Sequence, residues 1–419
     1  MRTQHSARSR RRAVDTLFGN RDFRLVFAAA SVSQLGAQIS YLAIPVVAVS
    51  VLHATSAQVG ILATLSTIAF LVIGLPAGVW VDRLRRRPVM ITADLARTVL
   101  LGSVPLTWWL GGLSLIQLYA VVLFAGVCTV FFDVASQSFL PHVVTRARLT
   151  DANSALISMN AVGDVSGRSI GGLLVQTLTA PAAIILDAAS YLWSAACVWR
   201  IRRFEPAAEH GHATHLGREM REGLRFVLGH PLLRAIAAKG ALNNVSSQLT
   251  VTLLPVLFVR ELRLPVGFLG AYLAVGGVGV FIGARCATRI GRRLGHGRAP
   301  WILGAALAPA NLLLPLIGRG PWLWAAAAAW LLSAFQIGID NVLLVSFRQR
   351  VTPDRLLGRM NATMRFLLHG ALALGSALAG LLGEVAGVRA ALWVSAVGLA
   401  LTWLPIFFSP LRRMRDLPA

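Results

Sequence analysis

Charged residues are scarce in this chain of 419 residues, since Asp, Glu, Lys and Arg together make up only 14% of it. A typical soluble domain carries about 25% charged residues, because its surface must face water. Acidic residues are especially few, with 17 against 40 basic ones, so that the formal net charge is +23. Together with 56% hydrophobic residues and a mean hydropathy of +0.67, this composition excludes an ordinary soluble domain and indicates that most of the chain faces lipid.

Cysteine is also rare in the sequence. Cys128, Cys197 and Cys286 each lie within an apolar segment, and their spacing matches neither a disulfide framework nor a metal-binding motif. We therefore expect these cysteines to be small residues of a helical core, without disulfides.

Motifs for enzyme chemistry are missing as well. The sequence contains no phosphate-binding loop of the form G-x-x-x-x-G-K-[S/T] and no paired nucleophile and base in a loop. His210, His212 and His215 share a polar segment with no cysteine, which is typical of a solvated linker and not of a metal site. We expect no cofactor, no metal and no enzyme activity. A membrane-embedded transferase remains a remote alternative, because it would need clustered His, Asp or Glu residues beside a phosphate site.

Long apolar segments dominate the sequence. Crossing a hydrocarbon core of about 30 Å takes roughly 20 apolar residues in a helix. The segments are continuous and do not alternate between apolar and polar residues, which predicts helices and not a β-barrel. We therefore expect an all-α membrane protein with twelve transmembrane helices, at residues 25–50, 57–80, 88–110, 115–139, 151–176, 182–200, 234–259, 266–288, 300–318, 322–346, 359–384 and 389–410.

The basic residues are distributed unevenly along this pattern. Most of the 40 lie in or beside the N-terminal tail, the C-terminal tail and the loops on one side of the predicted membrane. The loops on the opposite side hold only Arg260, Arg263, Arg319 and Arg389. This asymmetry follows the positive-inside rule and predicts that both termini are cytoplasmic. Because no soluble basic domain is left over, we expect no nucleic-acid partner.

The sequence contains an internal repeat. Displacing the chain by 208 positions aligns residues 138–139 with 346–347, and Gly172 with Gly380. Such a repeat predicts two pseudo-symmetric bundles of six helices, related by an axis along the membrane normal. We expect a tail at 1–24, a bundle at 25–200, a linker at 201–233, a second bundle at 234–410 and a tail at 411–419. The linker should hold an amphipathic helix whose apolar side carries Met220, Leu224, Val227 and Leu228.

A short arginine-rich turn joins the second and third predicted helices. It contains the pattern G-x-x-x-D-R-x-x-R-R, formed by Gly78, Asp82, Arg83, Arg86 and Arg87. This spacing resembles the loop between helices 2 and 3 of the major facilitator superfamily, whose usual form has Gly at the position of Arg85. The resemblance implies that these residues, with Asp133 on helix 4, form ion pairs that close a cytoplasmic gate, with the aspartate of the loop at the N-terminus of helix 11. The alternative is that the charges only set the topology.

Two charged residues lie inside the predicted helix 151–176. Asp164 and Arg168 share one helix face, where each isolated charge costs on the order of 2.5–3.5 kcal/mol on insertion scales. The surrounding segment resembles the helix-5 signature of proton-coupled exporters, G-x-x-x-G-P-x-x-G-G, with Arg168 in place of the proline. The resemblance implies that Asp164 takes up and releases a proton, whereas the alternative is a permanent structural ion pair. The small residues of this helix predict close packing against a neighbour, or sliding on it, at Gly163, Gly167, Gly171 and Gly172.

Polar and aromatic residues within the predicted helices mark a candidate substrate cavity between the two bundles. Such groups cost free energy in a membrane unless they face water, substrate or another helix. The candidates are Gln34, Gln38, Tyr41, Phe132, Asn243, Asn244, Gln248, Gln336, Arg365 and His369. Each of them could equally satisfy a helix contact. A mostly apolar lining with amides and aromatic rings suits a bulky, amphipathic small molecule and not a sugar phosphate.

The spans, the arginine-rich turn, the glycines of helix 5 and the linker together resemble the bacterial exporters of macrolides and of siderophores within the major facilitator superfamily. The resemblance implies a monomeric, multi-pass protein of the bacterial plasma membrane. It further implies alternating access, with export of a hydrophobic drug or natural product in exchange for protons. An importer or uniporter of a small metabolite stays open as an alternative, because the proline of the helix-5 signature is replaced by Arg168.

Overall fold

The computed structural model describes residues 17–145, 148–201 and 216–414, and these residues are almost entirely helical. The three histidines of the predicted linker, at 210, 212 and 215, lie outside the described residues. In chain order the elements are η1 (Leu17–Gly19), α2 (Arg21–Ser50), α3 (Ser56–Asp82), α4 (Arg86–Trp109), α5 (Leu115–Val143), α6 (Leu149–Leu178), α7 (Ala180–Trp199), α8 (Leu216–Gly229), α9 (Pro231–Pro255), η3 (Val256–Glu261), α10 (Val266–Leu294), α11 (Ala299–Asn311), η4 (Leu314–Leu316), α12 (Pro321–Val351), α13 (Asp354–Val385), α14 (Val388–Ala400), α15 (Leu404–Phe407) and η5 (Pro410–Arg413).

The helices match the predicted spans. Within the described residues, eleven helical segments are long and apolar enough to cross a membrane. The twelfth predicted span corresponds to α6, whose 30 residues give it sufficient length. Its composition sets it apart, because Asp151, Asp164 and Arg168 interrupt the apolar residues. The prediction of an all-helical, multi-span membrane protein is therefore confirmed.

The chain forms two compact units. The first unit comprises Met1–Ile44 and Val72–His212, and the second comprises Pro45–Leu71 and Ala213–Ala419. The segment 45–71, which contains the end of α2 and the first half of α3, thus packs with the second unit. The division into bundles at 25–200 and 234–410 stays a prediction.

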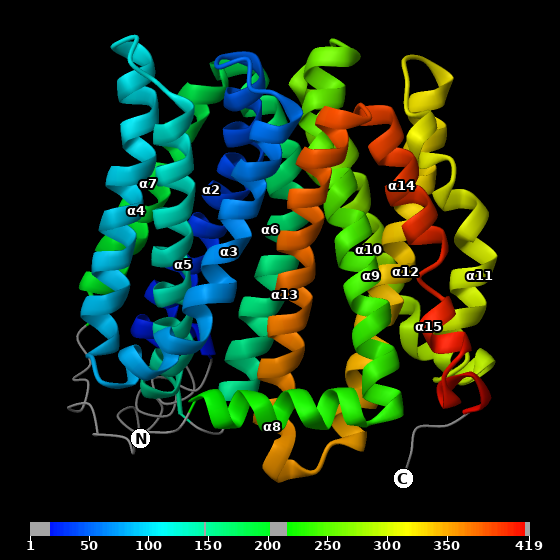
Figure 1. Cartoon of the computed structure of the whole chain (residues 1–419). Coiled ribbons are helices and arrows are strands. Elements are labelled where there is room, and N and C mark those ends of the chain that lie inside the picture. Colours follow the sequence, from blue (N-terminus) through cyan, green and yellow to red (C-terminus); the bar gives the residue numbers. More distant parts are fainter. Residues whose placement is uncertain (1–16, 146–147, 202–215, 415–419) are drawn as a thin grey trace, which may run out of the picture. The chain divides into compact units, whose positions relative to one another are not determined.

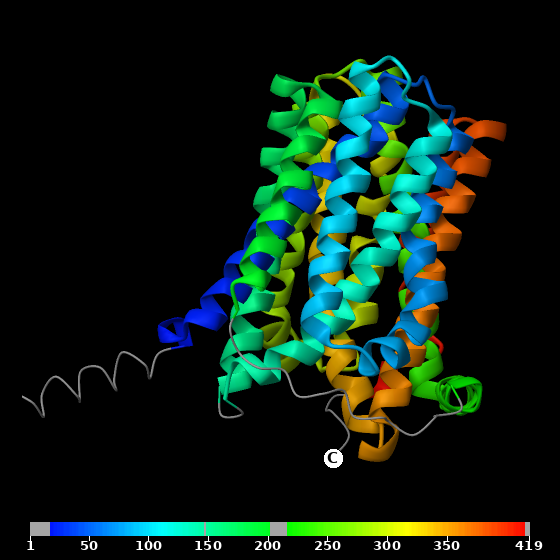
Figure 2. The same cartoon turned by 90° about the vertical axis from the view of Figure 1, so that its left-hand side faces the viewer.

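In the first unit, α4 packs against both α5 and α7, and these three helices run side by side in both views of the molecule (Figure 1 and Figure 2). Apolar side chains near one end of the unit form a core that includes the buried residues Phe23, Met90, Phe139 and Val143. Burying such side chains away from water stabilises this end of the unit, by about 1.5–3 kcal/mol for each large one.

In the second unit, α10 packs closely along α12, and α13 packs along α9. Glycines make the first of these contacts possible. A Cβ atom at Gly283 would lie 2.0 Å from the backbone oxygen of Phe335, and one at Gly338 would lie 2.2 Å from the backbone oxygen of Val280. Without a hydrophobic driving force between helices in lipid, such close backbone approach supplies the packing energy.

The first half of α3 is fixed to α13 within the second unit. A Cβ atom at Gly60 would lie 2.3 Å from the Cα atom of Gly380, so the two backbones touch at this crossing. One turn further along α13, the Glu384 carboxylate accepts a hydrogen bond of 3.1 Å from the backbone N–H of Ala57. A carboxylate in this position stabilises the N-terminus of α3, where backbone N–H groups lack partners within the helix.

The linker helix α8 lies across the ends of α9 and α13 (Figure 1) and is seen end-on in Figure 2. The residues of its predicted apolar side differ in burial. Val227 is fully buried in a cluster with Leu233 and Met360, whereas Met220, Leu224 and Leu228 are exposed. The reason is the close approach of α8 to α13, where a Cβ atom at Gly223 would lie 2.3 Å from the hydroxyl of Thr363. Contact with the protein is therefore centred on Gly223 and Val227.

Candidate functional site

A cluster of polar side chains joins α2 and α6 about halfway along α6. The Asp164 carboxylate accepts a hydrogen bond of 2.9 Å from the side-chain amide of Gln34 and one of 2.5 Å from that of Gln38. All three side chains are partly buried. Asp164 lies 15 positions after the first residue of α6, too far from either end for its carboxylate to reach the unpaired backbone groups of a helix terminus. The glutamines of α2 satisfy this carboxylate instead.

Gln38 also links Asp164 to Arg168. The Arg168 Nε donates a hydrogen bond of 3.2 Å to the Gln38 side-chain oxygen, and the guanidinium carbon lies 5.3 Å from the ring centroid of Tyr41. Among the described residues, Asp164 and Arg168 form no direct ion pair within 4 Å. The amide of Gln38 therefore holds the two charges apart, donating to one and accepting from the other.

The glycines of α6 lie on the face that meets α2. A Cβ atom at Gly163 would lie 2.9 Å from Gln34 Cγ, and one at Gly167 would lie 2.8 Å from Gln38 Cβ. At Gly171 the nearest atom is the Cα atom of Ile39, at 3.2 Å, and the adjacent residue at position 172 is buried. Because these residues lack side chains, α6 comes close enough to α2 for the glutamines to reach Asp164.

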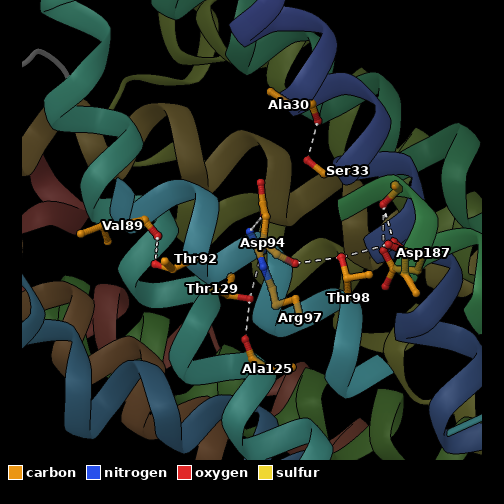
Figure 3. Close-up of polar contacts among 12 residues, drawn as sticks. Ala30, Ser33, Val89, Thr92, Asp94, Arg97, Thr98, Ala125, Thr129 and Asp187 are labelled. Atoms are coloured by element: carbon orange, nitrogen blue, oxygen red, sulfur yellow. Dashed lines mark hydrogen bonds and ion pairs between the residues drawn. The ribbon is translucent and has the colours of Figure 1, made fainter. Parts of the chain in front are cut away.

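A second buried cluster lies between α4, α5 and α7 (Figure 3). Arg97 forms an ion pair with Asp94, one helical turn earlier, and both side chains are almost completely buried. The Arg97 guanidinium carbon lies 4.6 Å from the ring centroid of Phe132 and 4.1 Å from that of Tyr191. The pair of rings and the carboxylate together compensate the buried cation. Phe132, a cavity candidate from the sequence, thus contacts Arg97.

Asp187 belongs to the same region (Figure 3). This residue lies two turns inside α7 and is 1% exposed. Its carboxylate accepts a hydrogen bond of 3.2 Å from the Ser190 hydroxyl, and a Cβ atom at Gly36 of α2 would lie 2.6 Å from it. α7 begins earlier than expected because Pro181 falls in its first turn, where the missing N–H of proline costs nothing.

The residues of the arginine-rich turn occupy different surroundings. The Arg87 guanidinium donates hydrogen bonds to the backbone oxygens of Val198 and Trp199, so it caps the C-terminus of α7. Arg83 is exposed, whereas Arg86, at the start of α4, is partly buried. Asp133 is a partly buried residue of α5. A Cβ atom at Gly78 would meet no atom within 4 Å. The side chain of Asp82 lies outside the described residues.

The remaining cavity candidates lie in the second unit. Asn243 and Asn244 line one cavity, and the Asn244 amide donates a hydrogen bond of 3.0 Å to the backbone oxygen of Leu368. The other four candidates are not part of this lining. Gln248 donates to a threonine of its own helix, Gln336 is buried, Arg365 is exposed, and the His369 ring stacks on that of Phe70.

The cavity holds charged residues that the sequence patterns did not select as site residues. The Lys239 ammonium forms an ion pair of 2.9 Å with the Asp340 carboxylate, and Arg348 belongs to the same lining. A signal for the first two was present in the sequence, because a charge within an apolar span is costly and is retained where it has a partner or a function. Their pairing could not be inferred, since the two residues lie on different helices.

Long apolar helices in two compact units, with charged side chains held inside several of the helices, define a membrane transporter. The sequence matches the Major Facilitator Superfamily over residues 26–367, and the chain belongs to that superfamily. Its members are transporters and not enzymes, so the chain is a multi-pass secondary transporter for a small-molecule substrate.

Two curated relatives cover almost the whole chain. The multidrug efflux pump Tap of Mycolicibacterium fortuitum is 28% identical over 409 residues, which are 94% of this chain and 97% of the relative. The enterobactin exporter EntS of Escherichia coli O1:K1 / APEC is 27% identical over 400 residues, 94% of each chain.

Solved structures show the same fold. A crystal structure of the nucleoside transporter NupG has a TM-score of 0.71 with 12% identity, and covers 92% of this chain and 99% of its own. A bacterial homologue of the human lysosomal transporter Spinster, in an inward-facing and occupied conformation, has a TM-score of 0.73, with 14% identity, over 91% of this chain and 95% of its own.

Proposed function

We propose that this transporter exports a hydrophobic or amphipathic drug or natural product, driven by protons that move inward. The observation that carries the proposal is the Asp164 carboxylate, held inside a span by Gln34 and Gln38. An ionised carboxylate accepts hydrogen bonds from both amides, and a protonated one keeps part of this acceptor capacity while gaining a donor. Asp164 therefore has partners in either protonation state, as a residue that carries a proton must.

The two curated relatives support the direction of transport. One is named a multidrug efflux pump and the other an enterobactin exporter, and both names describe the outward movement of a small molecule. The polar cluster adds a chemical reason for a broad substrate class, since Gln34, Gln38 and Tyr41 offer amides and an aromatic ring beside apolar side chains. Sites of this composition suit amphipathic solutes.

Alternating access requires a gate, and the arginine-rich turn is the proposed cytoplasmic one. In this proposal Asp82, Arg83, Arg86 and Asp133 form ion pairs that hold the transporter closed to the cytoplasm, and both termini are cytoplasmic. Arg87 contributes indirectly, because its bonds to the end of α7 fix the start of α4. The working unit is a monomer.

The proposal is tested by efflux from a bacterial host that lacks its own drug pumps. Cells that express the wild-type protein should accumulate less fusidate, an amphipathic drug that carries a carboxylate, than cells with an empty vector. The difference should disappear with a protonophore and in an Asp164→Asn variant. Asp151→Asn is the matched control, because Asp151 is an exposed residue in the first turn of the same helix. Higher accumulation with the wild-type protein would contradict export and favour uptake.

A further inference from the structure

The second unit contains a charged cavity of ≈ 190 Å³ between α9, α12 and α13. Three helices contribute its lining, and the polar part of that lining consists of Lys239, Asn243, Asn244, Asp340, Asn341 and Arg348. Cavities that enclose a whole drug-sized ligand measure about 300–1,000 Å³. This one is smaller, so it has room for one chemical group of a solute and not for the entire molecule.

Lys239 is the most deeply buried charge of the cavity. Its side chain is 3% exposed and that of Asp340 is 14% exposed, and a distance of 2.9 Å separates the Lys239 Nζ from the Asp340 Oδ2. An ammonium group has three N–H donors, and among the described residues this carboxylate is its only ion-pair partner. The pair uses one of these donors, and the other two can point into the cavity.

Arg348 adds a second cation to the lining. It follows Asp340 on α12 by eight positions, which is just over two helical turns, so both residues lie on the same side of that helix. Its Nε atom is buried and has no hydrogen-bond partner among the described residues. A buried donor without a partner is unfavourable, and more so when it is charged, so an acceptor in the cavity would be bound favourably.

The charges of the cavity do not cancel. Lys239 and Arg348 are positive and only Asp340 is negative, which leaves an excess of one positive charge. Amides accompany these charges, with Asn244 fixed by its bond to the Leu368 backbone oxygen. Aliphatic side chains such as Ile236, Leu344 and Leu368 form the rest of the wall. A cation would be repelled here, whereas the anionic group of a solute would be attracted by the excess positive charge.

We infer that this cavity binds the anionic group, a carboxylate, of an amphipathic substrate. Lys239 and Arg348 contact the carboxylate, and Asp340 is a positioning residue that holds the Lys239 ammonium in place. The inference rests on the proposed function, because it names the substrate class of the same transporter. It extends that function to acids whose apolar part lies outside the cavity.

Binding to the purified full-length protein in detergent tests the inference without transport. The probes are naphthalene-2-carboxylate and naphthalene-2-carboxamide, which share an apolar body and differ in charge, and calorimetric titration measures their affinities. The carboxylate should bind about tenfold or more tightly than the carboxamide, as charge-assisted hydrogen bonds predict. Arg348→Gln should weaken binding of the carboxylate far more than binding of the carboxamide and so remove most of this preference. Arg350→Gln, at an exposed position of the same helix, should keep it.

A second variant guards against misfolding. Lys239→Gln alone leaves the Asp340 carboxylate unpaired, so the informative change is Lys239→Gln combined with Asp340→Asn, which removes both charges. This double variant should fold and should also lose the preference for the carboxylate. Equal affinities for the two probes in the wild-type protein, or an unchanged preference in both variants, would overturn the inference and make the ion pair purely structural.

Anionic lipid is the other source of a negative group. Dihexanoyl phosphatidylglycerol added to the same titration distinguishes the two sources. If the cavity is a substrate site, this lipid should displace the bound naphthalene-2-carboxylate only weakly. If the lipid displaces naphthalene-2-carboxylate at concentrations lower than those at which the carboxylate itself binds, the cavity is a site for a lipid headgroup, and the assignment to substrate is overturned. Failure of drug efflux in cells, with the carboxylate preference intact, would refute the proposed function and leave the anion subsite standing.

Discussion

The side-chain amide of Gln38 donates a hydrogen bond of 2.5 Å to the carboxylate of Asp164. The same side chain accepts a hydrogen bond from Arg168, so one neutral residue of α2 serves two opposite charges of α6. This arrangement differs from a direct ion pair, in which the two charges would largely neutralise each other. In the proposed mechanism, a change of protonation at Asp164 would alter its hydrogen bond with Gln38 and in this way reach α2.

Gln38→Met should destabilise the protein by about 0.6–2 kcal/mol, the range that double-mutant cycles and model peptides give for hydrogen bonds between helices in membranes. The physical reason is that the Arg168 guanidinium loses its acceptor. Arg168→Met should therefore cost less in the Gln38→Met background than in the wild-type protein. Thermal or denaturant unfolding in mixed micelles measures the four proteins of this double-mutant cycle. Strictly additive effects would show that the two side chains do not interact.

Gly167→Ala should disturb the contact between α6 and α2. The added methyl group would lie 2.8 Å from the Gln38 Cβ, and such overpacking typically costs about 1–3 kcal/mol. Gly74→Ala is the matched control, because a Cβ atom at that helical position meets nothing within 4 Å. The control should be neutral or slightly stabilising, since alanine has the higher helix propensity. Equal unfolding temperatures for the two variants would contradict the close packing of α6.

Asp94→Asn should be among the most destabilising single substitutions. It leaves Arg97 charged and buried between two aromatic rings, and removing one partner of a buried ion pair costs about 3–5 kcal/mol. Replacing both partners, as in Asp94→Leu with Arg97→Met, should restore much of the lost stability, because no unpaired charge remains. Folded yield and unfolding temperature check this order. A double variant that is less stable than Asp94→Asn would give the pair a role beyond charge compensation.

Arg87→Gln should lower the free energy of unfolding, whether or not the arginine-rich turn forms a gate. Its guanidinium bonds to the last carbonyls of α7, and a cation at a helix C-terminus contributes about 0.3–1 kcal/mol, or up to about 2 kcal/mol when partly buried. Arg85→Gln, two positions away and exposed, should change stability by no more than about 0.5 kcal/mol. Unfolding of the two variants in detergent gives the comparison. A larger loss for Arg85→Gln would show that the capping contact is not what stabilises this turn.

The helical fold could be predicted from the sequence, because continuous apolar segments of membrane length leave few alternatives to helices. The exception in hydropathy, α6, is also the helix with the most costly charges, so Asp164 and Arg168 could be singled out by cost alone. The sequence could not reveal that Gln38 would lie between them. That contact depends on the register of α2 against α6, which is set by the packing of Gly163 and Gly167.

Other features depended on contacts between helices distant in sequence. Lys239 and Asp340 could each be recognised as a charge in or near a span, but their pairing requires the packing of α9 and α12. Arg87 belongs to a motif that suggests a gate, yet its bonds go to the end of α7, which lies far away in the chain. The apolar side of α8 was predicted by periodicity, whereas the contact of Gly223 with α13 decides which part of it is buried.

The most direct test of the account is proton movement driven by substrate in everted membrane vesicles loaded with a pH-sensitive dye. Addition of fusidate, an amphipathic drug that carries a carboxylate, to vesicles that contain the wild-type protein should release protons from the lumen, at a rate that rises with the drug concentration. Vesicles with Asp151→Asn should behave in the same way, and vesicles with Asp164→Asn should show no drug-dependent proton movement although the protein is folded and present. Unchanged proton movement in the Asp164→Asn vesicles would contradict the claim that this carboxylate couples protons to export.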